Sequence, residues 1–238
     1  MKNFYVLTKK LDICDVGFDG KSGITEIMSL FQRALTFHTF ELGVDFESVK
    51  KNHNAKWFIS SAHIEIFKAP KIHDEVIVKT WPLSPSAVRF PRAFVLKDSG
   101  GQTIAAAYTE WCTVDCDSGK LLRSSVVTLP IDEYLEDVPV KRESKIEQKP
   151  TFPVYSKTVR VSDLDINAHV NNVSYIRFAL DAFSTKELDT LDIKTFDIDY
   201  KTQTFEGDTV TIEKSEDNLC LVGKNGDSVI FVANINKK

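Results

Sequence analysis

The chain is poor in cysteine and lacks the spacings that cysteine chemistry requires. Its 238 residues include four cysteines, which form no C-x-x-C pair, at Cys14, Cys112, Cys116 and Cys220. No histidine stands near them at the spacing of a zinc ligand, which argues against a structural metal site or a disulfide framework. We therefore expect reduced thiols, mostly small buried side chains, and no metal.

Long hydrophobic runs and an excess of positive charge are also missing. The first residues, MKNFYVLTKKLDI, reach lysine and aspartate early, and no run of about 18 apolar residues occurs anywhere. Thirty Lys and Arg against 34 Asp and Glu give a formal net charge of -4. This balance offers no general surface for nucleic acid or for an anionic membrane. We expect a cytoplasmic protein that has neither as a partner.

Two common catalytic motifs are absent. Because no G-x-S-x-G elbow occurs, a serine esterase is unsupported. The segment DVGFDGKS, residues 15–22, nearly matches the phosphate-binding pattern G-x-x-x-x-G-K-S, but Asp15 stands in place of its first glycine. A carboxylate there opposes a phosphate, and the antiparallel strands predicted after it are the wrong setting for this motif. We do not expect nucleotide binding.

The hydrophobic pattern predicts two halves with the same plan. In the first half, apolar residues recur at helical spacing over residues 23–38, with Ser22 as the candidate N-cap. Alternating patterns predict four strands there, over residues 62–67, 75–81, 89–97 and 103–114. The second half repeats this order, with a helix at 172–183 and strands at 154–161, 194–200, 209–214, 219–224 and 228–234.

A gap-free similarity between the halves favours a duplication. Residues 67–78 align with residues 200–211 at an offset of 133, which pairs Glu75 with Asp208. One helix covers only one face of a sheet, so we expect the halves to pair side by side as a pseudo-dimer. The predicted class is α+β, with domains at residues 1–130 and 153–238. Residues 131–152, rich in Glu, Lys and Pro, are the predicted linker.

Polar residues crowd into one short stretch of the second half. Residues 162–175, SDLDINAHVNNVSY, place Asp165, Asn167 and His169 in the pattern D-x-N-x-H just before the predicted helix. In a turning segment, a carboxylate, an amide and an imidazole at this spacing can converge on one water. Together they can accept its proton and donate to a developing oxyanion, as hydrolysis of an acyl compound requires. The alternative is an ordinary loop that caps a helix.

The string D-L-D-x-N-x-H-V-N-N-x-x-Y, residues 163–175, closely resembles the signature of acyl-acyl carrier protein thioesterases of plant plastids and bacteria. Residues 60–82 and 105–121 are similar to the N-terminal half of that family in order and spacing. The resemblance implies two fused hotdog domains, in each of which a curved antiparallel sheet wraps a long helix. It also implies hydrolysis of the thioester that joins a fatty acyl chain to acyl carrier protein, without a cofactor, which ends chain elongation.

The resemblance also assigns catalytic residues. The family's catalytic Asp, Asn and His fall on Asp165, Asn167 and His169, and its further catalytic Glu falls on Gln203. An amide cannot act as a general base. We therefore expect Asp165 to activate water, directly or with His169 as the proton carrier, while Asn167 donates to the thioester oxygen. The runner-up is attack by Asp165 itself to form an anhydride.

Supporting residues are expected around this centre and in the first half. Asp163, Asn171 and Asn172 are candidates for the layer behind the catalytic groups, where the start of the helix can stabilise negative charge. The corresponding stretch of the first half, residues 11–23, has no Asn or His, so we expect a single active site. The resemblance implies that the first half holds the acyl chain, with candidate lining residues Ile27, Phe31, Trp57, Ile64 and Ile66.

The expected partner is an acidic acyl carrier protein, bound by a monomer or a homodimer. Five basic residues are candidates for docking it, namely Lys68, Lys71, Arg89, Arg92 and Lys97. Three other functions remain open: an acyl-coenzyme A thioesterase of the same fold, a non-catalytic acyl-binding module, and a dehydratase. In the binding module, Gln203 would mark lost chemistry.

Overall fold

The computed structural model describes residues 2–142 and 144–238. Its contacts divide the chain into two compact units, Met1–Lys141 and Arg142–Lys238. The division falls within residues 131–152, the stretch for which the sequence predicts a linker. Among the described residues, no helix combines the length and the apolar character needed to cross a bilayer.

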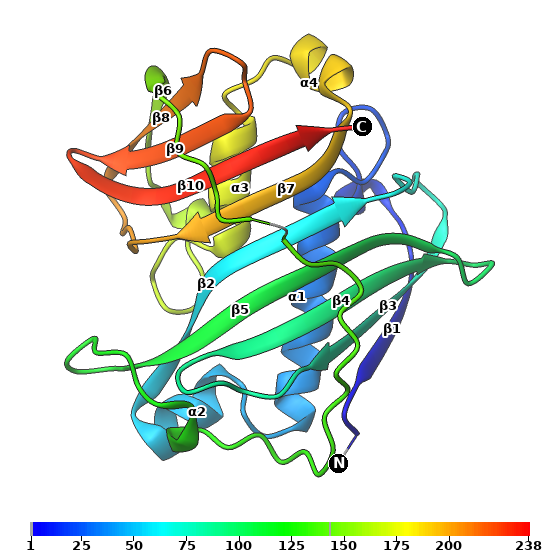
Figure 1. Ribbon diagram of the computed structural model, residues 1–238, viewed down its shortest axis with the longest axis vertical. Helices are drawn as coiled ribbons and strands as arrows, with labels where there is room; N and C mark the ends of the chain where they lie inside the picture. Colours follow the sequence, from blue (N-terminus) through cyan, green and yellow to red (C-terminus); the bar gives the residue numbers. More distant parts are fainter. Residues whose placement is uncertain (1, 143) are drawn as a thin grey trace. The chain divides into compact units, whose positions relative to one another are not determined.

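The first unit wraps an antiparallel sheet around one long helix, α1 (Ile24–Glu41), which lies behind the strands in Figure 1. The strand order is β1 (Tyr5–Lys10), β3 (Glu75–Pro82), β4 (Phe90–Asp98), β5 (Thr103–Asp115) and β2 (Ala55–Ile66). Phe31 of α1 stacks on Phe94 of β4 with ring centroids 5.1 Å apart. The apolar stripe of the helix therefore forms the core of this unit, as its periodicity predicts.

Shorter elements complete the first unit. Helix α2 (Phe46–His53) begins at Asp45, whose carboxylate accepts from two N–H groups of the first turn. Two 3-10 turns, η1 (Ile13–Asp15) and η2 (Ser124–Val126), lie before α1 and after β5. The sequence patterns predict neither α2 nor β1, because both are short and bury few side chains.

The predicted N-cap of α1 is wrong. Ser22 is fully buried, and its hydroxyl donates to the Asp15 carbonyl at 2.7 Å instead of capping the helix. The N-cap is Gly23, whose N–H donates to the Glu26 carboxylate at 3.0 Å. A helix can begin at glycine here because the side chain three residues later supplies the missing partner.

The second unit repeats the plan around helix α3 (Asn172–Leu180), which lies behind the sheet in Figure 1. Its strand order is β7 (Ile193–Tyr200), β10 (Ser228–Lys237), β9 (Cys220–Asn225), β8 (Thr209–Ser215) and β6 (Thr151–Thr158). The 3-10 turn η3 (Val161–Asp163) precedes α3, and helix α4 (Thr185–Leu191) follows it. The predicted helix at 172–183 is thus shorter than expected, and α4 is not predicted.

The turn after the first strand has the same hydrogen bonds in both units. In the first unit, the Asp15 carboxylate accepts from the N–H of the residue three positions earlier at 2.9 Å and pairs with Lys9 at 2.8 Å. In the second unit, Asp163 makes the corresponding hydrogen bond at 2.9 Å and pairs with Lys157 at 3.3 Å. Corresponding residues here differ by 148 (163 − 15 = 157 − 9).

A second repeated turn precedes β3 and β8. The Lys71 N–H donates to the Asp74 carboxylate at 2.8 Å. The Phe205 N–H donates to the Asp208 carboxylate, also at 2.8 Å. Corresponding residues in this part of the chain differ by 134 (208 − 74 = 205 − 71).

The alignment of the halves at an offset of 133 is therefore wrong by one residue. In the alignment, the observed offset matches Val76 with Val210 and Val78 with Ile212, and all four side chains are fully buried. Since successive strand residues face opposite sides of a sheet, an error of one residue matches a buried position with an outward one. The offset of 133 pairs the partly exposed Ile77 with the buried Val210.

Candidate active site

The D-x-N-x-H stretch is a tight turn between η3 and α3. The Asp165 N–H donates to the His169 carbonyl at 2.8 Å, and the Ala168 N–H donates to the Asp165 carbonyl at 3.0 Å. Ala168 takes a left-handed conformation with φ of 58°, which lets the chain fold back. The side chains at 165, 167 and 169 therefore all come from one small loop.

Asp165 and Asn167 contact each other directly. One oxygen of the Asp165 carboxylate accepts from the Asn167 backbone N–H at 2.7 Å, and the other accepts from its side-chain Nδ2 at 3.3 Å. An amide carries two hydrogens, so one remains for another acceptor. Both side chains, like that of His169, are partly exposed. The carboxylate is thus oriented while it remains accessible to water.

His169 lies against a second loop, between β7 and β8. Its imidazole is 4.9 Å from the Phe205 ring, between centroids. The Val170 N–H donates to the Thr204 carbonyl at 3.1 Å, which joins the two loops next to His169. Gln203 immediately precedes Thr204 and is partly buried. The structure therefore places Gln203 in the segment that is bonded to the D-x-N-x-H turn.

Tyr175 and Thr204 belong to this site, although the sequence patterns assign them no role. The Thr204 N–H donates to the Tyr175 phenol oxygen at 3.0 Å, and the two hydroxyl groups share a hydrogen bond of 2.8 Å. Burial raises the pKa of Tyr175, against the effect of the Thr204 hydrogen bonds, and the charge of Asp165 adds to the rise. The only signal in the sequence is that Tyr175 ends the motif string.

The three expected supporting residues make hydrogen bonds that involve backbone groups. The Asp163 carbonyl accepts from the Asn171 N–H at 2.9 Å and from the Ser174 hydroxyl at 3.1 Å. Asn171 is the N-cap of α3, where its side chain accepts from a backbone N–H at 2.9 Å. The Asn172 carbonyl accepts from the Tyr200 phenol at 3.3 Å. These residues hold the ends of the turn and the start of α3.

The same turn occurs in the first unit without the candidate catalytic side chains. The Gly17 N–H donates to the Lys21 carbonyl at 2.8 Å, and the Gly20 N–H donates to the Gly17 carbonyl at 3.0 Å. Gly20 has a φ of 74° at the position of Ala168. The turn presents Gly17, Asp19 and Lys21 where the second unit has Asp, Asn and His. The segment that resembles a nucleotide-binding loop is therefore the counterpart of the D-x-N-x-H turn.

The candidate acyl-lining residues lie in the interior of the first unit. Trp57 is partly buried, and its indole N–H donates to the Val44 carbonyl at 2.9 Å. The others are at most 5% exposed, and they are Ile27, Phe31, Ile64 and Ile66. All are placed where they pack a core, so their contact with an acyl chain stays a prediction.

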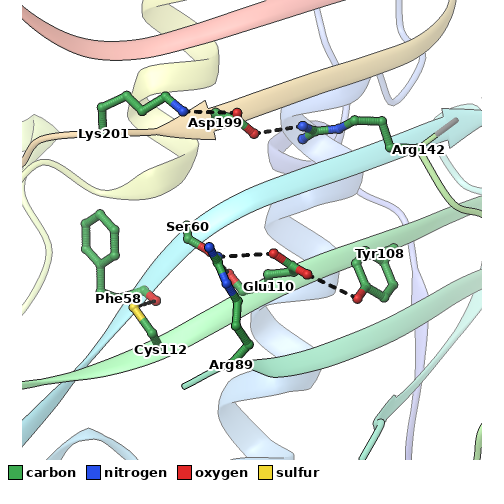
Figure 2. Close-up of polar contacts among 9 residues, drawn as sticks. All are labelled: Phe58, Ser60, Arg89, Tyr108, Glu110, Cys112, Arg142, Asp199 and Lys201. Atoms are coloured by element: carbon green, nitrogen blue, oxygen red, sulfur yellow. Dashed lines mark hydrogen bonds and ion pairs between the residues drawn. The ribbon is translucent and has the colours of Figure 1, made fainter. Parts of the chain in front are cut away.

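The prediction that Arg92 docks a protein partner is wrong. Arg92 is only 5% exposed, and its guanidinium donates to Thr80 at 3.2 Å and lies 3.1 Å from His38 Nδ1. A buried cation in contact with α1 cannot meet a protein partner. Arg89 is more exposed, but it pairs with Glu110 at 3.1 Å and also bonds Ser60, as Figure 2 shows.

All four cysteines are free thiols. Cys112 and Cys220 are buried, as expected, and the Cys112 thiol lies 3.6 Å from the Phe58 carbonyl (Figure 2). Cys14 is exposed and Cys116 is partly buried, so Cys14 is a surface thiol and not a buried side chain.

Curated relatives of the chain are plant enzymes. Oleoyl-acyl carrier protein thioesterase 2, chloroplastic, of Arabidopsis thaliana is 28% identical over 240 residues, which cover 90% of this chain and 65% of the relative. Oleoyl-acyl carrier protein thioesterase, chloroplastic, of Coriandrum sativum is 27% identical over 239 residues, covering 89% of this chain and 64% of the relative. The chain thus spans slightly less than two thirds of the length of these relatives.

Solved structures show the same fold. An acyl-ACP thioesterase from Bacteroides thetaiotaomicron superposes with a TM-score of 0.87 at 23% identity, covering 98% of this chain and 97% of the other. The 12:0-ACP thioesterase from Umbellularia californica superposes with a TM-score of 0.82 at 20% identity, covering 99% and 97%. The predicted α+β class with two fused hotdog domains is confirmed.

Family models match both units. The model for the acyl-ACP thioesterase N-terminal domain matches residues 2–127, and the model for the C-terminal domain matches residues 146–231. Together they cover most of the first unit, the D-x-N-x-H turn and the loop that contains Gln203. The chain therefore belongs to the acyl-ACP thioesterase family.

Proposed function

We propose that this protein hydrolyses the thioester of fatty acyl-acyl carrier protein and releases the free fatty acid, which ends chain elongation. The observation that carries this proposal is the D-x-N-x-H turn, in which the Asp165 carboxylate is oriented by two hydrogen bonds from Asn167. Membership of the acyl-ACP thioesterase family supports the substrate class. The first domain, predicted at residues 1–130, holds the acyl chain, and the second carries the chemistry.

The proposed reaction begins with a water beside the Asp165 carboxylate. Asp165, with His169 as proton carrier, accepts a proton as the water oxygen attacks the thioester carbon. The free hydrogen of the Asn167 amide donates to the oxyanion that forms. When the carbon–sulfur bond breaks, the proton passes to the phosphopantetheine sulfur, which leaves as a thiol. Gln203 orients the water through its amide and does not act as a base.

The test is release of thiol from acyl carrier protein that carries a fatty acyl chain. The parent protein should release thiol, and His169→Ala should lower kcat by about 100-fold or more, as loss of a proton-transfer group usually does. Acyl-coenzyme A of the same chain length separates the acyl-ACP enzyme from a coenzyme A thioesterase. Binding of acyl carrier protein without thiol release would contradict the proposal and support a non-catalytic acyl-binding module.

We also propose a cytoplasmic location, because the four cysteines are free thiols. The plant relatives named above are chloroplastic. The proposed partner is acyl carrier protein, bound by a monomer or a homodimer, and its candidate contacts are Lys68, Lys71 and Lys97. Light scattering of the purified protein separates the two oligomeric states.

A further inference from the structure

We propose that Tyr175 and Thr204 form a positioning pair that holds the two loops of the active site together. In this proposal neither residue contacts the substrate. The pair would fix His169 and Gln203 relative to each other by bonding α3 to the loop between β7 and β8. This inference rests on the proposed function, because it concerns the alignment of the same catalytic groups.

The pair is buried and connects directly to the site. Thr204 is 0% exposed and Tyr175 is 4% exposed. The phenol of Tyr175 accepts from the Thr204 N–H at 3.0 Å and shares a bond of 2.8 Å with its hydroxyl. The Thr204 carbonyl in turn accepts from the Val170 N–H at 3.1 Å, next to His169. Hydrogen bonds therefore run without a break from α3, through the loop, to the D-x-N-x-H turn.

Tyr175 is itself held rigidly. Its ring packs against three aromatic rings, with centroids between 5.8 and 6.0 Å away, which belong to Phe178, Tyr200 and Phe231. The ring of Phe205, the residue after Thr204, contacts the His169 imidazole. A group held by a packed core can fix a loop that would otherwise move, and catalytic groups require such support.

The first unit provides an internal comparison. Its residues at the positions of Tyr175 and Thr204 are Ile27 (175 − 148) and Pro70 (204 − 134), both buried. Isoleucine has no hydroxyl group and proline has no N–H, so both partners of the hydrogen bond are absent together.

The first unit nevertheless keeps the bond that joins the two loops. The Ser22 N–H donates to the Pro70 carbonyl at 2.8 Å, the counterpart of the bond from Val170 to Thr204. The turn therefore folds without a tyrosine and a threonine behind it. Because the polar pair occurs only in the unit with Asp165, Asn167 and His169, we assign it to the chemistry of that unit and not to its folding.

The test compares Tyr175→Phe and Thr204→Val with the parent in the thiol-release assay. We expect each to lower kcat by about 10- to 100-fold with KM within about twofold, because a shift of about 1 Å in catalytic groups has that effect. The double variant should be no slower than Tyr175→Phe, since that change removes both hydrogen bonds of the pair and Thr204→Val removes only the bond between the two hydroxyl groups. Thr204→Ser, which keeps the hydroxyl and the N–H, should retain parental kcat.

The matched control is Tyr155→Phe. The Tyr155 phenol donates to the Phe178 carbonyl of α3 at 2.6 Å, so its loss also removes a hydrogen bond of a tyrosine to this helix, but not one that joins the two loops. We expect Tyr155→Phe to lower the melting temperature and leave kcat unchanged. Parental kcat in Tyr175→Phe and Thr204→Val would overturn the inference. Absence of thiol release by the parent would instead overturn the proposed function.

Discussion

His38 is a histidine that the fold keeps neutral. It is fully buried in α1, where Arg92 lies 3.1 Å from Nδ1 and the Lys2 carbonyl lies 3.2 Å from Nε2. Burial and then the charge of Arg92 lower the pKa of His38 from 6.5 to about 4. The folded state therefore binds fewer protons than the unfolded state between these two values. The contribution of His38 to stability is fully present above pH 6.5 and is lost as the pH falls toward 4.

A stability measurement tests this coupling. By linkage, His38 should lower the free energy of unfolding by about 2 kcal/mol at pH 5 relative to pH 7.5. His38→Gln keeps a donor and an acceptor but does not titrate, so this part of the pH dependence should disappear. Urea denaturation of both proteins at the two pH values gives the difference, and equal pH dependence in the two would contradict the assignment.

Side-chain identity also limits what the sequence could predict about the site. Asp165, Asn167 and His169 are evident because three polar types alternate before a helix. Tyr175 and Thr204 are not evident, because a tyrosine in an apolar helix is a usual core residue and a threonine in a polar loop is a usual loop residue. Their relation depends on two segments that are far apart in the sequence and meet only in the fold.

Among the elements, β9 and β10 are packed without space for an added side chain. A Cβ built on Gly223 of β9 would meet the ring of Phe231, which is fully buried in β10. The ring cannot move away because it also contacts Tyr175. We expect Gly223→Ala to lower the free energy of unfolding by about 1 to 3 kcal/mol, the usual effect of overpacking.

Chemical denaturation would measure this effect, and a second substitution would identify its cause. Phe231→Leu removes the ring edge that the new methyl group would strike. The double variant Gly223→Ala, Phe231→Leu should therefore lose less stability than the two single changes added together. Strict additivity would show that the glycine is needed for another reason.

The long helix and most strands were predictable, but the first half of β2, the strand β1 and the short helices α2 and α4 were not. Helix α1 and strands β3, β4 and β5 have many apolar residues at a constant period, and the structure has them within a few residues of the prediction. β1 buries no residue, and α4 buries only Leu191, so their periodicity is weak. The offset between the halves was missed by one residue because chance similarities, such as Lys68 with Lys201, outweighed the true pairing of Asp74 with Asp208.

At the scale of the whole chain, one backbone plan occurs twice and the chemistry once. The turn at Gly17 and the turn at Asp165 have matching hydrogen bonds, with lengths of 2.8 and 3.0 Å in each. Only the second carries a carboxylate, an amide and an imidazole together. The first unit thus shows what the fold needs for its own stability, and the differences in the second unit mark what the proposed reaction needs.

Two substitutions of the same kind, Asp165→Asn and Asp19→Asn, test this division most directly. Each replaces a carboxylate by an amide of the same shape in one of the two corresponding turns. Each new amide can still accept the backbone hydrogen bond that the aspartate accepts. We predict that Asp165→Asn lowers kcat for thiol release from acyl carrier protein by about 100-fold or more, the effect of removing a general base, while Asp19→Asn retains the parental value. Parental kcat in Asp165→Asn, or an equal loss in both variants, would contradict a reaction centre at the D-x-N-x-H turn.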